Sequence, residues 1–328
     1  MMIEEILTNL YRIEIPLPKS PLKALNSYVI KYPERNLVID TGWNQEECMN
    51  AMHRGLRQLG VDLRKTDYFI THIHSDHLGL VSNLITDTST IYFNQPDADR
   101  FNSGIYLDDF VIFARLNGYP ENELQDALHS HPGLKFRSKG NLVFHILKEG
   151  DKISIGDYIL KCVETPGHTM GHMCLYEPNK KILVAGDHIL NDITPNIQLW
   201  SDGWNPLKEY LVSLDKVYEL DIELVLPGHR GIFKNCKERI RELKDHHQKR
   251  LNEIISILEK GEKSAFQVAS QMSWDIIYDS WDLFPLTQKW FAIGEAISHL
   301  KYLEEDRIIQ KEIQEQMVVY SLKSVLFR

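Results

Sequence analysis

Four side chains of the types that bind metal ions lie within six residues, directly after a short apolar segment. The apolar segment is Asp67-Tyr68-Phe69-Ile70, and the four residues are His72, His74, Asp76 and His77. Such a segment predicts a buried strand, so the cluster occupies the loop at the strand's carboxyl end, where α/β sheets place their ligand sites. Imidazole and carboxylate groups are the usual ligands of zinc and related metals. We therefore expect a metal site at the edge of an α/β sheet.

The order of the four residues predicts that they serve two metal ions. In an extended loop, alternating side chains point the same way. We therefore expect His72 and His74 to face one ion, and Asp76 and His77 to reach a second one. The segment alone supplies too few ligands for two closed sites, so further His or Asp residues are needed at other strand ends.

Three other segments place a ligand-type residue after a predicted strand and a tight turn. They are Thr165-Pro166-Gly167-His168-Thr169, Ala185-Gly186-Asp187-His188 and Leu226-Pro227-Gly228-His229. Small or rigid residues before each ligand allow the backbone to approach closely. We therefore expect His168, Asp187 and His229 to lie beside the first cluster.

Short apolar and alternating segments predict the elements around these ligands. Strands are expected over residues 11–15, 26–30, 36–40, 67–70, 142–147, 158–163, 173–176, 181–185 and 224–226, and helices over residues 45–59 and 207–220. The strands 173–176 and 181–185 are expected to form a hairpin. Strands alternating with helices in this way indicate an α/β fold.

Two segments have a role that the sequence leaves open. Residues 95–138 carry Tyr106, Phe110, Phe113 and Leu116 at helical spacing and predict a helical insertion. The insertion either caps the metal site or packs elsewhere without touching substrate. The loop 189–204 follows Asp187, so we expect it to line a substrate pocket; alternatively, its tryptophans are core residues.

The last part of the chain has a different character. Helices are expected over residues 238–259, 265–272 and 288–303, followed by a two-stranded ribbon over residues 307–322. This order predicts a winged-helix-like module over residues 236–328, after a catalytic domain over residues 1–235. Residues 238–328 contain 13 Lys and Arg against 15 Asp and Glu. A DNA-reading module is basic, so we expect this one to pack on the catalytic domain or to form a homodimer.

The ordered motifs resemble those of the metallo-β-lactamase superfamily over about residues 1–235. The similarity rests on His72-x-His74-x-Asp76-His77, on His168 in Thr-Pro-Gly-His-Thr, on Asp187 in Gly-Asp and on His229 in Pro-Gly-His. Asp40 in Ile-Asp-Thr-Gly also matches a recurring element of the superfamily. Among its members, the chain is most similar to the glyoxalase II-like and β-lactamase-like protein 2 types.

The resemblance implies a four-layer αββα sandwich with the metal ions at one edge, a helical insertion at about residues 95–138 and a C-terminal winged-helix-like module. It also implies the ligand sets. The first ion would be held by His72, His74 and His168, and the second by Asp76, His77 and His229, with Asp187 bridging both. Asp76 and Asp187 would be the catalytic residues among them. Behind the ligands, His172 is expected to pack as a supporting residue.

Two divalent ions so arranged imply a hydrolase. Zinc is expected, with iron and manganese as alternatives, since His and Asp sites accept all three. Two ions about 3.5–4 Å apart can share a hydroxide that is a nucleophile at neutral pH. We therefore predict a hydrolase that uses a metal-bridging hydroxide on a small ester, thioester or lactone. Asp76 would orient the hydroxide and handle its proton.

The sequence leaves three alternatives to this hydrolase open. The motif set is also similar to that of persulfide dioxygenases, which use a single iron. An oxidoreductase is therefore the first alternative. A nuclease or phosphodiesterase is the second, although a net charge of -9 argues against a broad phosphate-binding surface. The third is a non-catalytic metal-binding protein, which the complete set of seven ligands disfavours.

Composition indicates an ordinary globular protein. Hydrophobic residues make up 43% of the chain and charged residues 25%. No segment approaches the 18 apolar residues of a membrane span, and the N-terminus is not typical of a signal peptide. We therefore expect a cytoplasmic protein with a small-molecule substrate and with neither a membrane nor a nucleic acid as its partner.

Overall fold

The computed structural model describes residues 2–104 and 107–323. Contacts between Cα atoms divide the chain into two compact units. Unit 1 comprises residues 1–104, 132–195 and 213–240, and unit 2 comprises residues 105–131, 196–212 and 241–328. Both units are therefore assembled from segments that are not continuous in the sequence.

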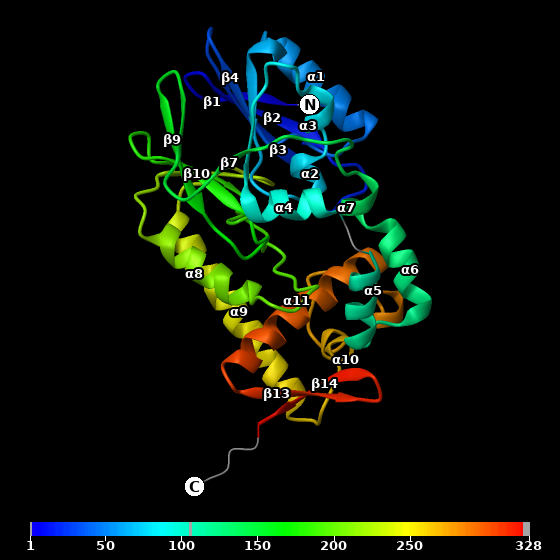
Figure 1. The fold of residues 1–328 in the computed structure, drawn as a ribbon. Coiled ribbons are helices and arrows are strands. Elements are labelled where there is room, and N and C mark those ends of the chain that lie inside the picture. The colour runs from blue at the N-terminus through cyan, green and yellow to red at the C-terminus, as the bar shows by residue number, and fades with distance from the viewer. Residues whose placement is uncertain (1, 105–106, 324–328) are drawn as a thin grey trace. The chain divides into compact units, whose positions relative to one another are not determined.

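Two mixed sheets form the centre of unit 1 (Figure 1). The seven-stranded sheet has the order β1 (Ile3–Leu7), β2 (Leu10–Pro16), β3 (Ala24–Lys31), β4 (Asn36–Ile39), β5 (Thr66–Phe69), β6 (Ile91–Asn94) and β7 (His145–Leu147). The five-stranded sheet has the order β12 (Leu224–Pro227), β11 (Ile182–Gly186), β10 (Met173–Glu177), β9 (Tyr158–Glu164) and β8 (Lys152–Ile155). Strands β4 to β7 are parallel, as are β11 and β12, so several carboxyl ends meet at one edge.

Alternating side chains of the first sheet divide between two cores. On β3, Tyr28 and Ile30 join the core that includes Leu160 of the second sheet. Val29, which points the opposite way, packs in the core that includes Met52 of helix α1 (Glu46–Gln58). Successive side chains of a strand point to opposite faces, so β3 is buried on both faces. Each fully buried aliphatic side chain of this kind contributes roughly 2 kcal/mol to folding.

Helices cover the outer faces of the two sheets. The first sheet is covered by α1, α2 (Ser75–Leu78), α3 (Val81–Leu84) and α4 (Gln95–Ser103), which supply apolar side chains to the same core. Residues 213–218 of α8 (Pro206–Tyr218) lie against the second sheet, where Ser213 donates a hydrogen bond to the Pro166 carbonyl. The remaining helical segments of unit 1 are η1 (Leu63–Lys65), α7 (Pro132–Lys135) and the start of α9 (Cys236–Leu258). The unit is an α/β sandwich, as predicted.

Unit 2 is built around the long helix α11 (Leu286–Glu305), most of whose residues are buried. Its other elements are α5 (Leu107–Leu116), α6 (Glu121–Ser130), the rest of α9, α10 (Ala265–Ala269), η2 (Trp281–Leu283) and the ribbon of β13 (Ile309–Gln314) and β14 (Met317–Leu322). Three helices followed by an antiparallel ribbon is the predicted order of the last part of the chain. Its assignment as a winged-helix-like module stays a prediction.

The predicted insertion at residues 95–138 is helical but is divided between the units. Helices α4 and α7 belong to unit 1, whereas α5 and α6 belong to unit 2; residues 105 and 106 lie outside the described residues. In unit 2, Glu123 of α6 forms an ion pair of 2.7 Å with the buried Lys289 of α11. Trp200 is also a core residue of unit 2, because its ring stacks on Trp290 with centroids 3.8 Å apart.

Some elements of the structure were not predicted from the sequence. The short strands β6 and β8 were not predicted. Strand β1 at the N-terminus is a further strand beyond those expected. Among the described residues, no helix combines the length and the apolar character that crossing a membrane requires.

Candidate metal centre

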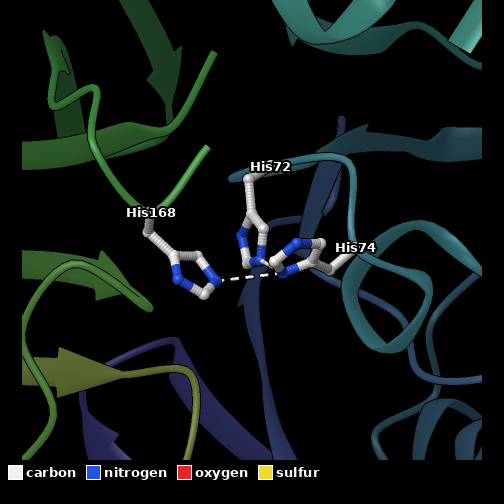
Figure 2. A group of neighbouring side chains, drawn as sticks. All are labelled: His72, His74 and His168. Carbon is white, nitrogen blue, oxygen red and sulfur yellow. Dashed lines mark hydrogen bonds between the residues drawn. The ribbon is translucent and has the colours of Figure 1, made fainter. Parts of the chain in front are cut away.

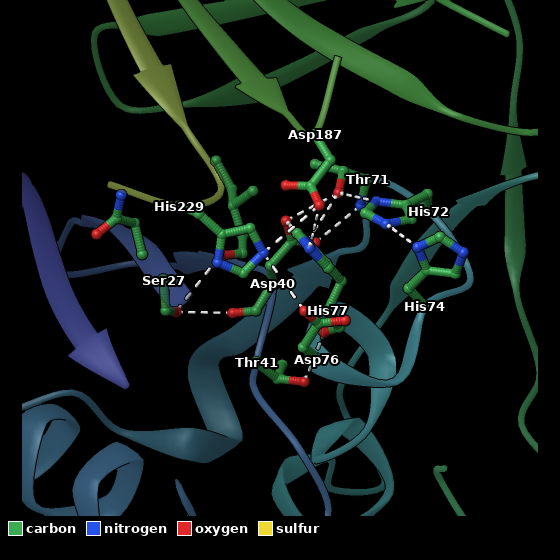
Figure 3. Close-up of polar contacts among 12 residues, drawn as sticks. Ser27, Asp40, Thr41, Thr71, His72, His74, Asp76, His77, Asp187 and His229 are labelled. Atoms are coloured by element: carbon green, nitrogen blue, oxygen red, sulfur yellow. Dashed lines mark hydrogen bonds and ion pairs between the residues drawn. The ribbon is translucent and has the colours of Figure 1, made fainter. Parts of the chain in front are cut away.

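The seven predicted ligands converge at one edge of the two sheets (Figures 2 and 3). His72 and His74 follow β5 of the first sheet, and Asp76 and His77 lie in helix α2. The other three ligands follow β9, β11 and β12 of the second sheet. The seven residues are His72, His74, Asp76, His77, His168, Asp187 and His229. All except His74 are buried. Residues separated by up to 157 positions thus meet because parallel and antiparallel strands end at the same place.

The extended conformation expected for residues 72–77 is only partly right. Residues Ser75–Leu78 form a helical turn, and the amides of His77 and Leu78 donate to the His74 carbonyl. Successive side chains of a helix point about 100° apart. Asp76 and His77 therefore leave the backbone in different directions, and both still face the centre.

His72, His74 and His168 form the first group (Figure 2). Nε2 of His72 lies 3.0 Å from Nδ1 of His74, and Nε2 of His168 lies 2.9 Å from the same atom. Three ring nitrogens that approach one another so closely compete for the same protons. A cation among them would satisfy all three lone pairs at once.

Asp76, His77 and His229 form the second group (Figure 3). Nε2 of His229 lies 3.3 Å from Oδ2 of Asp76. Within the described part of the chain, Nε2 of His77 and Nε2 of His229 are buried and have no hydrogen-bond partner, and the same is true of Oδ1 of Asp187. Buried polar atoms without partners are costly and rare, so their convergence indicates a site for a cation.

Asp187 lies between the two groups. Its Oδ2 is 3.5 Å from Nε2 of His77, 3.5 Å from Nε2 of His229 and 3.6 Å from Nε2 of His168. Ligands bound tetrahedrally to zinc at about 2.0–2.1 Å lie about 3.3 Å from one another. The spacings around Asp187 are therefore close to those that metal ligands require, and they are too long for good hydrogen bonds.

The outer ring nitrogens of the histidines are held by other groups. Nδ1 of His77 lies 2.7 Å from Oδ2 of Asp40, and Nδ1 of His229 lies 2.7 Å from the Ala24 carbonyl. Because carbonyl and carboxylate oxygens only accept, Nδ1 carries the proton in both rings and the lone pair of Nε2 points to the centre. Metal-binding histidines are commonly oriented in this way.

Asp40 organises this support. Besides His77, it accepts hydrogen bonds from the amide and the hydroxyl of Thr71, both at 2.8 Å. Its backbone φ is 58°, in the left-handed region that few residues other than glycine, Asn and Asp enter. The sequence indicated Asp40 only as an element of the superfamily, and the structure shows what it touches.

The two groups differ in their electrostatics. Burial, together with the neighbouring histidines, lowers the pKa values of His72 and His74 well below the ordinary value, so both rings are neutral. Burial also acts to lower the pKa of His229, but the carboxylates of Asp187 and Asp76 outweigh it and raise that pKa to about 10. The pKa values of His72 and His74 in the first group are thus lowered, whereas the pKa of His229 in the second group is raised by the carboxylates beside it.

The carboxylates respond to the same charges. Burial would raise the pKa of Asp76, but His77 and His229 lower it to about 2. For Asp187, the same two histidines hold the pKa well below its usual range against the effect of burial. Both carboxyl groups are therefore anions at neutral pH, and they require positive charge beside them. A divalent cation held among these histidines and carboxylates would supply that charge.

Supporting residues were only partly foreseen. His172 packs behind the site, as predicted: its Nδ1 lies 2.7 Å from the Thr165 hydroxyl, and its Nε2 accepts from the Asp187 amide at 3.2 Å. Asp97, which contacts two ligand-bearing loops, was missed. It stands three residues after β6, so the strand-end rule that found the ligands would have indicated it if that strand had been predicted.

Comparison with known proteins identifies the family of the chain. The model of the metallo-beta-lactamase superfamily matches residues 22–229. A beta-lactamase-like protein 2 homolog of Caenorhabditis elegans is 24% identical over 254 residues, which cover 76% of this chain and 71% of that protein. The acyl-coenzyme A thioesterase MBLAC2 of Bos taurus is 25% identical over 224 residues, which cover 63% of this chain and 74% of that protein.

A solved structure extends the comparison to almost the whole chain. The crystal structure of a metallo-beta-lactamase family protein from Thermus thermophilus matches with a TM-score of 0.82 and 26% identity, covering 97% of this chain and 100% of that one. All seven residues of the centre lie inside the segment that the family model matches. From its fold, its ordered motifs and these matches, the chain belongs to the metallo-β-lactamase superfamily.

Proposed function

We propose that the protein is a hydrolase that uses two divalent metal ions on a small-molecule thioester, with esters and lactones as related substrates. The first group would hold one ion and the second group the other, with Asp187 shared between them. The observation that carries this proposal is the position of Oδ2 of Asp187, 3.5–3.6 Å from one histidine of the first group and two of the second. Zinc fits the donor set, as do iron and manganese.

The chemistry requires water as the nucleophile. When bound, the two ions would activate water at neutral pH and polarise the scissile carbonyl. As a carboxylate of the second group, Asp76 would accept a hydrogen bond from the attacking water, orient it and take part in moving its proton. Asp40 and the Ala24 carbonyl hold the rings of His77 and His229 in place during the reaction.

No cysteine is suited to act as the nucleophile instead. All four cysteines are buried. Burial raises the pKa of Cys162, Cys174 and Cys236 to about 12 and that of Cys48 to about 11. Thiols in such surroundings are inert, which supports direct attack by water.

Two relatives that are named thioesterases support the preference for thioesters. The bovine protein that matches over 224 residues is named an acyl-coenzyme A thioesterase. A net charge of -9 also disfavours long nucleic acids as substrates.

An activity assay with a panel of acyl-coenzyme A thioesters, small esters and lactones tests the proposal. We expect metal-dependent thioester hydrolysis, which is lost on chelation and restored by zinc, iron or manganese. The variant Asp187→Ala should lose at least about 100-fold in kcat/KM, since it removes the shared ligand. Oxygen consumption with a persulfide, in protein that holds one iron, would instead indicate a dioxygenase.

A further inference from the structure

The carboxylate of Asp97 joins two loops that carry histidines of the first group. Oδ2 of Asp97 accepts a hydrogen bond of 2.9 Å from the amide of Ile73, which stands between His72 and His74. The same oxygen accepts a hydrogen bond of 2.8 Å from the hydroxyl of Thr169, the residue after His168. One side chain thus contacts both loops that carry the histidines of the first group.

The second oxygen of this carboxylate extends the link. Oδ1 of Asp97 accepts from the amide of Gly171 at 3.0 Å. A β-carbon added to Gly171 would lie 2.7 Å from Cγ and 2.7 Å from the amide nitrogen of Asp97. Such a distance is a steric overlap, so the loop packs directly on the start of α4 and has little freedom to shift.

Asp97 is buried and well compensated. Its side chain is fully buried, in the first turn of α4. Burial raises the pKa of the Asp97 carboxyl, while the hydrogen bonds from Thr169, Ile73 and Gly171 oppose this by favouring the anion. The positive end of the helix favours the anion as well. A buried carboxylate persists only with such partners, and these partners belong to the ligand-bearing loops.

The second group has a different support. Its histidines His77 and His229 are held by Asp40 and by the Ala24 carbonyl. None of the hydrogen bonds that the structure gives for Asp97 goes to a residue of the second group. A change at Asp97 should therefore affect the first group and leave the second one largely intact.

We propose that Asp97 is a positioning residue that fixes the loop of His72 and His74 against the loop of His168, so that the three rings can hold one metal ion. The inference rests on the proposed metal centre. Partners of this kind around metal ligands typically contribute about 10- to 100-fold to metal affinity.

The variant Asp97→Asn tests the proposal with little change in volume. An amide has one accepting oxygen and one donating NH₂ group. Whichever way it is turned, its NH₂ faces the N–H of Ile73 or of Gly171, so at least one hydrogen bond is lost. The matched control is Asp99→Asn, because Asp99 lies on the same helix but is exposed and bonds only Gln95 among the contacts described.

Metal-free protein is titrated with Co²⁺, visible absorption is followed, and a chelator competition gives the two dissociation constants. A His168→Ala variant identifies which bound equivalent belongs to the first group. We expect Asp97→Asn to lower the affinity for the Co²⁺ ion of the first group by about 10- to 100-fold and to alter its absorption bands. The affinity for the other Co²⁺ ion should be nearly unchanged. Asp99→Asn should behave as the wild type.

Several outcomes would overturn the inference. Equal Co²⁺ affinities in Asp97→Asn and the wild type would do so, and so would a lower unfolding midpoint of the metal-free protein without any change in affinity. If Asp97→Asn does not fold, Thr169→Val can replace it, because this variant removes only one of the three hydrogen bonds. An unchanged Co²⁺ affinity of the first group in Thr169→Val would contradict the inference. A wild type that binds no Co²⁺ would instead refute the metal centre itself.

Discussion

Asp40 and His77 form a buried pair whose Oδ2 and Nδ1 atoms lie 2.7 Å apart. The pair joins the end of strand β4 to helix α2, and it turns Nε2 of His77 towards Asp187. Asp40 stands at a positive φ of 58°, a conformation that Asn also adopts readily. The charge of Asp40 can therefore be removed without changing the backbone.

Asp40→Asn should lower the affinity for one metal ion by about 10- to 100-fold, because the ring of His77 loses its negatively charged partner. The affected ion should be the one that belongs to the second group. Chelator competition monitored by Co²⁺ absorption measures this effect. Asp97→Asn should instead lower the affinity for the other ion. The two variants are therefore expected to affect different ions. Loss of the same ion in both would show that the two supports are not separate.

Asp187→Asn should lower the affinity for both ions, since Oδ2 of Asp187 approaches histidines of both groups. Elemental analysis after dialysis should then give less than one ion per chain. Asp192→Asn is the control, because Asp192 is exposed on the loop that follows. If Asp187→Asn retained one tightly bound ion, Asp187 would belong to one group only.

The ion pair of Lys289 and Glu123 should be asymmetric in its effect on stability. The Lys289 side chain is fully buried, whereas that of Glu123 is 23% exposed. Glu123→Gln leaves a buried ammonium without its counter-charge and should cost about 3–5 kcal/mol. Lys289→Met should cost less, because the remaining carboxylate can reach water. Urea unfolding measures both values.

Glu121→Gln is the control for this comparison. Glu121 forms an exposed ion pair with Arg115 in the same segment, and exposed pairs contribute little. Its removal should leave the unfolding free energy nearly unchanged. Equal costs for Glu123→Gln and Lys289→Met would contradict the burial argument.

A buried histidine pair in unit 2 should make folding stability depend on pH. Nδ1 of His247 lies 3.0 Å from Nε2 of His299, whose own Nδ1 lies 2.8 Å from the Glu295 carbonyl. Burial lowers the pKa of His299 to about 3 and that of His247 well below its ordinary value. Both rings are thus neutral in the folded protein and take up protons more readily when it unfolds. Their contribution is present above about pH 6.5 and is lost as the pH falls.

Each such histidine should reduce the unfolding free energy by about 1.4 kcal/mol per pH unit below about pH 6.5. His247→Phe keeps an aromatic ring beside Tyr210 and should make the pH dependence shallower by about that amount. Urea unfolding at pH 7, 6 and 5 tests this, with the exposed His129→Phe as the control. Parallel curves for His247→Phe and the wild type would show that the pair does not titrate on unfolding.

The ligand positions could be predicted because each one combines a local signal with a strand end. His168, Asp187 and His229 follow apolar segments that are long enough to be recognised as strands. The topology then brings the carboxyl ends of these strands together. The alternation of Tyr28, Val29 and Ile30 between two cores was equally accessible, because it depends only on the period of a strand.

Other features depend on contacts that leave no local pattern. Strand β6 has only four residues, and because it was not predicted, the acid three residues later was overlooked. The helical turn at Ser75 is shorter than any periodicity can show. Trp200 belongs to unit 2 because it stacks on Trp290, a partner ninety positions away. Only packing decides such assignments.

The metal content of purified, catalytically active protein tests the central claim most directly. Elemental analysis should find two divalent ions per chain, falling below one in Asp187→Asn, with thioester hydrolysis lost in parallel. A single iron per chain, together with oxygen consumption and no hydrolysis, would contradict the account.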